Sequence, residues 1–258
     1  MTHSVQASQE TLSIDDELEA HDRQETDQRT ERTRLLFSGL RLPLLLMLLA
    51  SLLMPALLWD GNGRLELGLW SACTLSLAIL HLQQGAAFAS ADATAQARPF
   101  WFQGLLLGNV LSALVLGYAM VALVPTEGFL AQTLLYGVLG SVIIAGSVAC
   151  GVSLWAFLSF TLPCLLPAGL LLLISEQPVQ KGWGLLGLIM LLTLGMIAWQ
   201  INRLVTLSLK QRADNILLIQ RLQHVSREAV ELNAELAREV DQRRLAERQL
   251  REAHDGLE

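Results

Sequence analysis

The sequence predicts an all-α, polytopic membrane protein with about six transmembrane helices, the last of which is continuous with a cytoplasmic parallel coiled coil. The distribution of charge is the first observation behind this prediction. Residues 1–34 hold 13 of the 42 charged residues and residues 203–258 hold 20, which leaves 9 for the 168 residues between them. A water-soluble domain of that length needs a charged outer surface that this middle part cannot supply. The other two observations are six apolar stretches and a heptad repeat near the C-terminus.

The N-terminal segment, residues 1–34, is polar and carries nine acidic residues against four arginines. It has no sustained apolar periodicity, and no apolar stretch follows a short basic head as a signal peptide requires. We therefore expect a disordered acidic cytoplasmic tail that is not cleaved. A short helix over residues 14–34 is the alternative.

Six apolar stretches follow in residues 35–205, which we interpret as a six-span transmembrane sensor domain. Crossing a hydrocarbon layer of ~30 Å takes about 20 residues at a rise of 1.5 Å per residue. The predicted spans are 38–59, 66–86, 100–124, 129–148, 151–174 and 183–205.

The division between the fourth and fifth spans is open. Residues 129–174 contain no charged residue and are too long for a single span. The small residues from Ala145 to Gly151 form either a tight turn or a weakly packed helix interior, and the second alternative moves the boundary by several residues. An even number of spans keeps both termini on one side of the membrane.

Lysine and arginine near the span ends predict the orientation, because cytoplasmic flanks carry an excess of both. Seven such residues lie on the side of the N-terminus: Arg32, Arg34, Arg41, Arg98, Arg203, Lys210 and Arg212. Arg64 and Lys181 lie on the opposite side. We therefore expect a multi-pass protein of a bacterial inner (plasma) membrane with both termini in the cytoplasm. The outer loops are a few residues long, so any signal is sensed in or near the bilayer.

Residues 206–258 change to a heptad repeat, which predicts a signalling helix that dimerises as a coiled coil. The apolar residues of the predicted dimer seam are Leu218, Leu222, Val225, Ala229, Leu232, Leu236, Leu250 and Leu257. Glu239 and Arg243 occupy seam positions and mark a weak point in it. They either fix the register at a cost in stability, or Val240 replaces Glu239 through a stutter that changes the local winding. A parallel homodimer is the simplest partner arrangement for such a helix.

Polar residues inside the predicted spans are candidates for function, because they are expensive in hydrocarbon. His81, Gln83 and Gln84 lie together at the end of the second span. Anchoring at the membrane interface is the favoured interpretation, with ligand binding or signal relay as the alternative. Asn109 lies ~13 Å into the third span by helical rise. Hydrogen bonding between helices explains it as well as ligand contact does.

Two prolines, Pro163 and Pro167, predict a kink in the fifth span, because each removes a backbone donor. They are also candidates for a hinge that relays the signal. Gly104 and Gly108 are four residues apart and permit close approach of a neighbouring helix, although such pairs occur in many bundles.

The sequence contains no catalytic, cofactor or metal motif. A phosphate loop, a nucleophile elbow and a His-Glu-x-x-His helix are all missing. Cys73, Cys150 and Cys164 lie in apolar runs without metal-ligand spacing, so we interpret them as buried small hydrophobic residues. The charge pattern does not favour binding to nucleic acid. Transport is disfavoured because no internal repeat and no charged residue at a span centre is found.

The exit from the last span, from Ile201-Asn202-Arg203 to the amphipathic helix ending at Ala253, resembles the membrane input region of bacterial sensor histidine kinases, chiefly hybrid ones, and of some diguanylate cyclases. The resemblance in architecture covers residues 35–258, and the resemblance in sequence pattern is confined to residues 201–253. In those families an output domain follows the coiled coil. The sequence has no His-box, no ATP-binding boxes, no GGDEF and no EAL sequence, so we expect a fragment that lacks its output domain, and no active-site residue is carried over.

The resemblance implies a sensory and signal-transmitting module of a two-component sensor histidine kinase. An input module of a cyclic-di-GMP enzyme is the alternative, and a stand-alone membrane scaffold or transporter is a third. The expected partners are the lipid bilayer, a second copy of the chain, and a lipid-soluble or membrane-embedded ligand. We expect no cofactor in this chain.

Overall fold

The computed structural model describes residues 26, 28–58, 64–125 and 128–255, and no strand occurs among them. Its helices are α2 (Arg41–Leu58), α3 (Arg64–Ser90), α4 (Ala93–Gln96), α5 (Phe100–Ala122), α6 (Phe129–Cys150), α7 (Leu154–Ile174) and α8 (Pro178–Asp255). In this described part, six helices are long and apolar enough to cross a membrane. The prediction of an all-α protein with six apolar helices of membrane length is confirmed, which indicates a multi-pass membrane protein.

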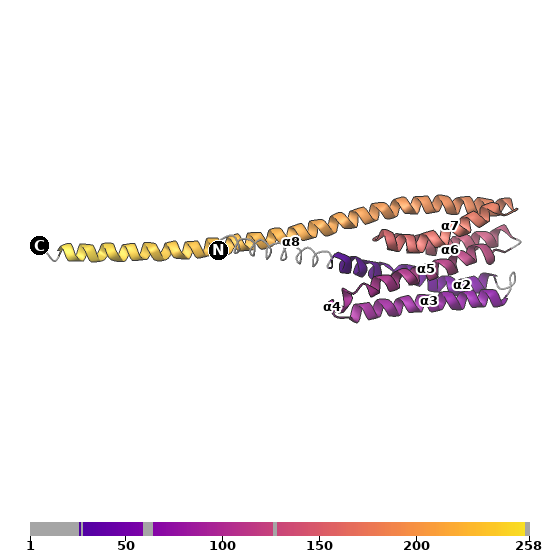
Figure 1. Cartoon of the computed structure of the whole chain (residues 1–258), viewed down its shortest axis with the longest axis horizontal. Helices are drawn as coiled ribbons and strands as arrows, with labels where there is room; N and C mark the ends of the chain where they lie inside the picture. The colour runs from indigo at the N-terminus through magenta and orange to yellow at the C-terminus, as the bar shows by residue number, and fades with distance from the viewer. Residues whose placement is uncertain (1–25, 27, 59–63, 126–127, 256–258) are drawn as a thin grey trace, which may run out of the picture. The chain divides into compact units, whose positions relative to one another are not determined.

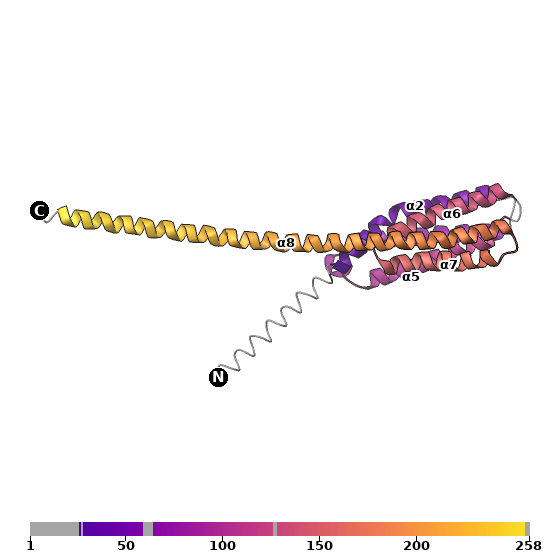
Figure 2. The ribbon, with the colours of Figure 1, turned by 90° about the horizontal axis from the view of Figure 1, so that it is seen from above.

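The chain divides into two compact units, Met1–Val205 and Thr206–Glu258. In the first unit α5 packs against α3 and α7, α2 packs against α3 and α6, and α6 packs against α7. Figures 1 and 2 show these five helices running side by side, with the short helix α4 at one end of the bundle. The second unit is the C-terminal part of α8, and a coiled coil remains a prediction for it.

The helical conformation begins earlier than the sequence predicted. Residues 28–39 are helical and lead into α2 through a turn at Leu40. For residues 28–34 the favoured expectation of a disordered tail does not hold, and the described residues agree with the alternative of a short helix. The physical reason is burial, because Thr33 and Leu36 are only 6% and 0% exposed and extend the packed face of the first span. Residues 1–25 of the predicted tail lie outside the described residues.

The turn at Leu40 has a cause in the sequence three residues later. Pro43 has no backbone N–H, so the carbonyl of Gly39 lacks its usual donor in the i−4 pattern. The pattern resumes at once on either side of this point: the N–H of Leu40 donates to Leu36 and the N–H of Leu44 donates to Leu40. The first apolar helix is therefore interrupted over a single residue.

The boundary between the fourth and fifth apolar helices lies between Cys150 and Leu154, where residues 151–153 turn. Residues 145–150 are therefore helical, as in the second alternative, but they are closely rather than weakly packed, and Gly151 belongs to the turn. Gly146 shows why they are small. A Cβ atom there would lie 2.6 Å from Cε1 of Phe160 on α7. Small residues at this point let the two helices approach closely.

The part of α8 in the first unit contacts α7 through two glycines. A Cβ atom at Gly184 would lie 2.8 Å from the carbonyl oxygen of Gly169 and 2.9 Å from the backbone nitrogen of Leu173. Close to this contact, the rings of Tyr136 on α6 and Trp183 on α8 stack with centroids 4.7 Å apart. Without a hydrophobic driving force between helices in lipid, such close packing supplies much of the attraction.

We expect Gly184→Ala to lower the free energy of unfolding by about 1–3 kcal/mol, because the new methyl group meets backbone atoms that cannot rotate away. The matched control is Gly187→Ala on the same helix, where a Cβ atom would have no neighbour within 4 Å. Its effect should stay within about 0.5 kcal/mol. Titration of the purified protein with dodecyl sulfate in mixed micelles measures both, and equal effects of the two substitutions would contradict the close α7–α8 contact.

Candidate functional site

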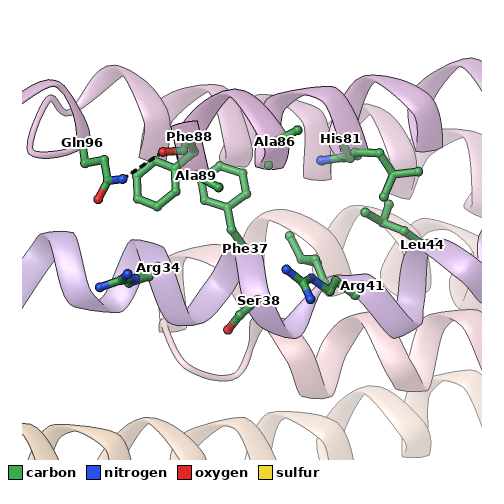
Figure 3. A pocket seen from close by; sticks show the side chains of 13 residues that line it. Arg34, Phe37, Ser38, Arg41, Leu44, His81, Ala86, Phe88, Ala89 and Gln96 are labelled. Carbon is green, nitrogen blue, oxygen red and sulfur yellow. Dashed lines mark hydrogen bonds between the residues drawn. The ribbon is translucent and has the colours of Figure 1, made fainter. Parts of the chain in front are cut away.

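A cavity of about 420 Å³ lies between the first apolar helix and the C-terminal half of α3, and we call it the outer pocket. Its polar lining comprises Arg34, Ser38, Arg41, His81 and Gln96, and the rest is apolar. Figure 3 shows Arg34 and Arg41 on the first helix and His81 on the facing helix α3. Its volume falls in the range of small-molecule sites. The lining contains cationic side chains and no acidic one.

Aromatic rings fix one end of the outer pocket. Phe37 and Phe88, from the two facing helices, stack with centroids 4.8 Å apart (Figure 3), and Trp101 meets Phe88 edge-on at 5.6 Å. The side-chain amide of Gln96 donates to the carbonyls of Phe88 and Ala91, at 3.0 and 2.9 Å. Phe88 lies in the last turn of α3 and Ala91 directly follows the helix, where backbone carbonyls lack the full set of helical donors. The end of α3 is thereby tied to α4, and this side of the pocket is preformed.

His81 forms the inner wall of the outer pocket and is only 5% exposed. Its Nε2 lies 3.3 Å from Oγ of Ser112 on α5. The ring fits there because residue 108 is a glycine: a Cβ atom at Gly108 would lie 2.6 Å from Cε1 of His81. Gly104 similarly leaves room for the amide of Gln84. The two glycines of the Gly104–Gly108 pair thus accommodate polar side chains of α3.

Asn109 lies one residue beyond that glycine pair and is 2% exposed. Its Nδ2 is 3.5 Å from Sγ of Cys150, 3.5 Å from the carbonyl oxygen of Ala156 and 3.5 Å from Oγ of Ser159. One amide therefore contacts both α6 and α7 at long hydrogen-bond distances. A second polar contact joins the same two helices, where the hydroxyls of Ser147 and Thr161 lie 2.7 Å apart.

The two candidate ligand residues, His81 and Asn109, meet at a second, smaller cavity. It also touches Ser112, Gly146 and Cys150, and its volume is about 20 Å³. That volume suffices for one water molecule and excludes a larger ligand. His81 lines this cavity and the outer pocket, so it connects the larger cavity to the polar contacts between α5, α6 and α7.

Pro163 and Pro167 lie inside α7 and flank a point where the backbone of α7 closely approaches α5. A Cβ atom at Gly117 would lie 3.0 Å from the carbonyl oxygen of Cys164 and 3.4 Å from its Cα. Because each proline lacks an N–H, the carbonyls four residues earlier lose their donors in the helix. The segment around Cys164 is thus the part of α7 with the weakest internal hydrogen bonding.

The predicted dimer seam lies on α8 in the second unit. Leu218, Leu222, Val225, Leu232 and Leu236 are 58%, 62%, 60%, 59% and 51% exposed, and Ala229 is exposed too. Within the described part of the unit this stripe has no covering element. Leu257 lies outside the described residues, as do the side chains of Glu239, Arg243 and Leu250, which fall within the helix.

Arg34, Arg41 and Phe37 are the site residues that sequence reasoning missed. The two arginines entered the sequence analysis only as markers of orientation. Their spacing of seven residues places them on one helix face, about 10 Å apart along the axis. The sequence shows that spacing, but it does not show that α3 forms the opposite wall of the cavity. Among the described residues, no group of three or more metal-ligating side chains comes together.

We expect Gly108→Ala to displace His81 and to lower the free energy of unfolding by about 1–3 kcal/mol, because the added methyl group overlaps the imidazole. In a His81→Ala background the same substitution should cost little, since the overlapping ring is gone. Gly137→Ala is the control, as a Cβ atom there has no neighbour within 4 Å. Unfolding of the wild type, the three single variants and the double variant in mixed micelles gives the comparison, and an undiminished cost in the His81→Ala background would refute the overlap.

Comparisons with known proteins found no matching family model, no matching curated protein and no matching solved structure. The function is therefore inferred from the geometry of the bundle and from the sequence of α8.

Proposed function

We propose that the chain is the transmembrane sensory and signal-transmitting module of a bacterial two-component sensor histidine kinase. The observation that carries this proposal is the form of α8. It is a single helix of 78 residues, which begins in an apolar segment of membrane length and continues to Asp255 with an exposed apolar heptad stripe. A helix of this kind supplies a covalent connection between a membrane bundle and an output domain.

The exposed stripe supports a homodimer. Five large apolar side chains at heptad spacing are more than half exposed in the single chain. Burying the exposed part of each, a little over half of its surface, against a second helix would stabilise the dimer by about 1–2 kcal/mol per side chain. Two copies anchored side by side in one membrane meet with parallel helices, which is the arrangement that the seam requires.

The charges of the bundle support an orientation with both termini in the cytoplasm. Arg34, Arg41 and α4, which Arg98 follows, lie at the same end of the bundle. At the opposite end, Arg64 is the first residue of α3 and Lys181 lies in the first turn of α8. By the positive-inside rule the end with the larger number of arginines faces the cytoplasm.

The proposed mechanism is a shift between two packings of the bundle. Ligand contact at His81 would alter the polar contacts that join α5 to α6 and α7. The weakly hydrogen-bonded segment of α7 between Pro163 and Pro167 would take up the change, and α8 would rotate or slide against α7. The seam position Glu239/Arg243 would then switch register, because coupling requires an element with two discrete arrangements.

Disulfide trapping tests the dimer. The interpretation of all three cysteines as buried is wrong for Cys73, which is exposed on α3, whereas Cys150 and Cys164 are buried. In a Cys73→Ser background, single cysteines at Leu222 and Leu236 should therefore cross-link in membranes. Seam positions of a parallel dimer bring their Cβ atoms near the distance of ~4 Å that a disulfide needs. Gel electrophoresis without reductant measures the dimer fraction.

Arg227→Cys and Ala234→Cys provide the controls, because both positions fall on the outer face of the same heptads. Their cross-linking should be several-fold weaker than that of the seam positions. Equal yields at all four positions would show that collision, and not a specific seam, joins the chains. That result would contradict the proposed dimeric signalling helix.

A further inference from the structure

We propose that the outer pocket binds an anionic amphiphile, with the oxyanion between Arg34 and Arg41 and the apolar chain along the facing surfaces of α2 and α3. The binding site stands on its own geometry. The further statement that its occupant is the signal rests on the proposed sensory function.

The charge of the lining supports an anion. Arg34 and Arg41 lie two helical turns apart on one face, His81 lies on the opposite wall, and no aspartate or glutamate lines the cavity. No ion pair joins either arginine to another residue in the part of the chain that the structure describes. Guanidinium groups bind carboxylates and phosphates through paired hydrogen bonds. Two such groups at the mouth of a cavity therefore favour an oxyanion.

The apolar remainder of the lining supports a chain attached to that anion. Phe37 separates the two arginines, and Leu40, Leu44 and Leu82 continue the surface toward the middle of the bundle. Leu40 and Leu44 are 6% and 7% exposed, so this wall is shielded by the protein. A free inorganic anion would leave the apolar surface uncovered. An amphiphile covers it and places its charge at the arginines.

The position of Arg41 in its helix supports an amphiphile that comes from the membrane or from its surface. Arg41 is the first residue of α2, and an apolar run begins directly after it. Arginine at such a boundary lies at the level of lipid headgroups. The oxyanion class is shared by a bilayer phospholipid with a net negative charge and by a diffusible fatty acid, and the experiment separates these two sources.

Isothermal titration calorimetry of the detergent-purified full chain tests the site with four probes. Dioctanoyl phosphatidylglycerol represents the anionic lipid, and laurate represents the fatty acid. Dioctanoyl phosphatidylcholine has the same chains with no net charge, and inorganic phosphate has the charge with no chain. We expect one of the two anionic amphiphiles to bind, and the tighter one identifies the source. Equal binding of phosphatidylcholine, or equal binding of inorganic phosphate, would overturn the proposal.

Substitutions then locate the binding. Arg34→Gln and Arg41→Gln should each weaken the anionic amphiphile about five-fold, since each headgroup contact with a basic residue is worth roughly that factor. Arg98→Gln is the control, because Arg98 is an exposed arginine at the same end of the bundle that does not line the cavity. An equal loss of affinity in Arg98→Gln would show that the arginines act only by general electrostatic attraction, and it would overturn the proposed site.

Gly85→Leu blocks the cavity without changing charge. A Cβ atom at Gly85 meets Cδ1 of Phe37 at 3.6 Å, an ordinary contact, so the added side chain extends into the pocket with little strain. Binding should fall at least ten-fold. Unchanged binding would show that the amphiphile does not occupy the pocket and would overturn the proposal. These measurements are independent of the cross-linking at Leu222 and Leu236. Failure here with a normal dimer seam would overturn the ligand site alone, and failure of the seam alone would overturn the signalling proposal.

Discussion

The absence of water from the hydrocarbon core of a bilayer is the constraint on which the structure depends. Polar groups between the helices must find partners inside the protein. In the described bundle the imidazole of His81 reaches Ser112, the amide of Asn109 reaches α6 and α7, and Ser147 reaches Thr161. Two buried oxygens, Oγ of Ser71 and Oε1 of Gln132, have no such partner. The indole N–H of Trp70 donates in the same way to the carbonyl of Val115, at 2.9 Å. Each pair links two helices, so the polar groups specify which helices are neighbours.

Glycine makes these pairs geometrically accessible. Gly108 leaves the space that His81 occupies, Gly146 receives the ring of Phe160, and Gly117 lets α5 approach the backbone of α7 at Cys164. In each case a methyl group would collide with a neighbouring helix. The small residues and the buried polar residues therefore act together: the first bring the helices close, and the second give each close approach a defined partner.

The sequence predicted the number of apolar helices correctly, because hydropathy over about 20 residues is a property of composition alone. It left the division at residues 145–151 open, since small residues are typical of turns and of tight helix packing alike. The structure resolves this through Gly146, which packs against Phe160 on the next helix. That contact forms only when the two helices fold together, so the sequence alone does not reveal it. The outer pocket was missed for the same reason. Arg34 and Arg41 share a face that the helical period reveals, but their opposite wall on α3 depends on the arrangement of helices.

The glycine contact between α7 and α8 has a consequence for biogenesis. Ile174 ends α7 and Pro178 begins α8, so only three residues connect the two helices, and Gly169 and Gly184 hold them at backbone distance close to that connection. Two apolar helices joined so tightly can enter the bilayer from the translocon as one hairpin. In the proposed orientation, the charged residues near the tip, Glu176 and Lys181, would cross together, and the strongly apolar α7 would offset a transfer cost of about 3 kcal/mol for each charge. With that orientation, the last two apolar helices would form a single unit of insertion.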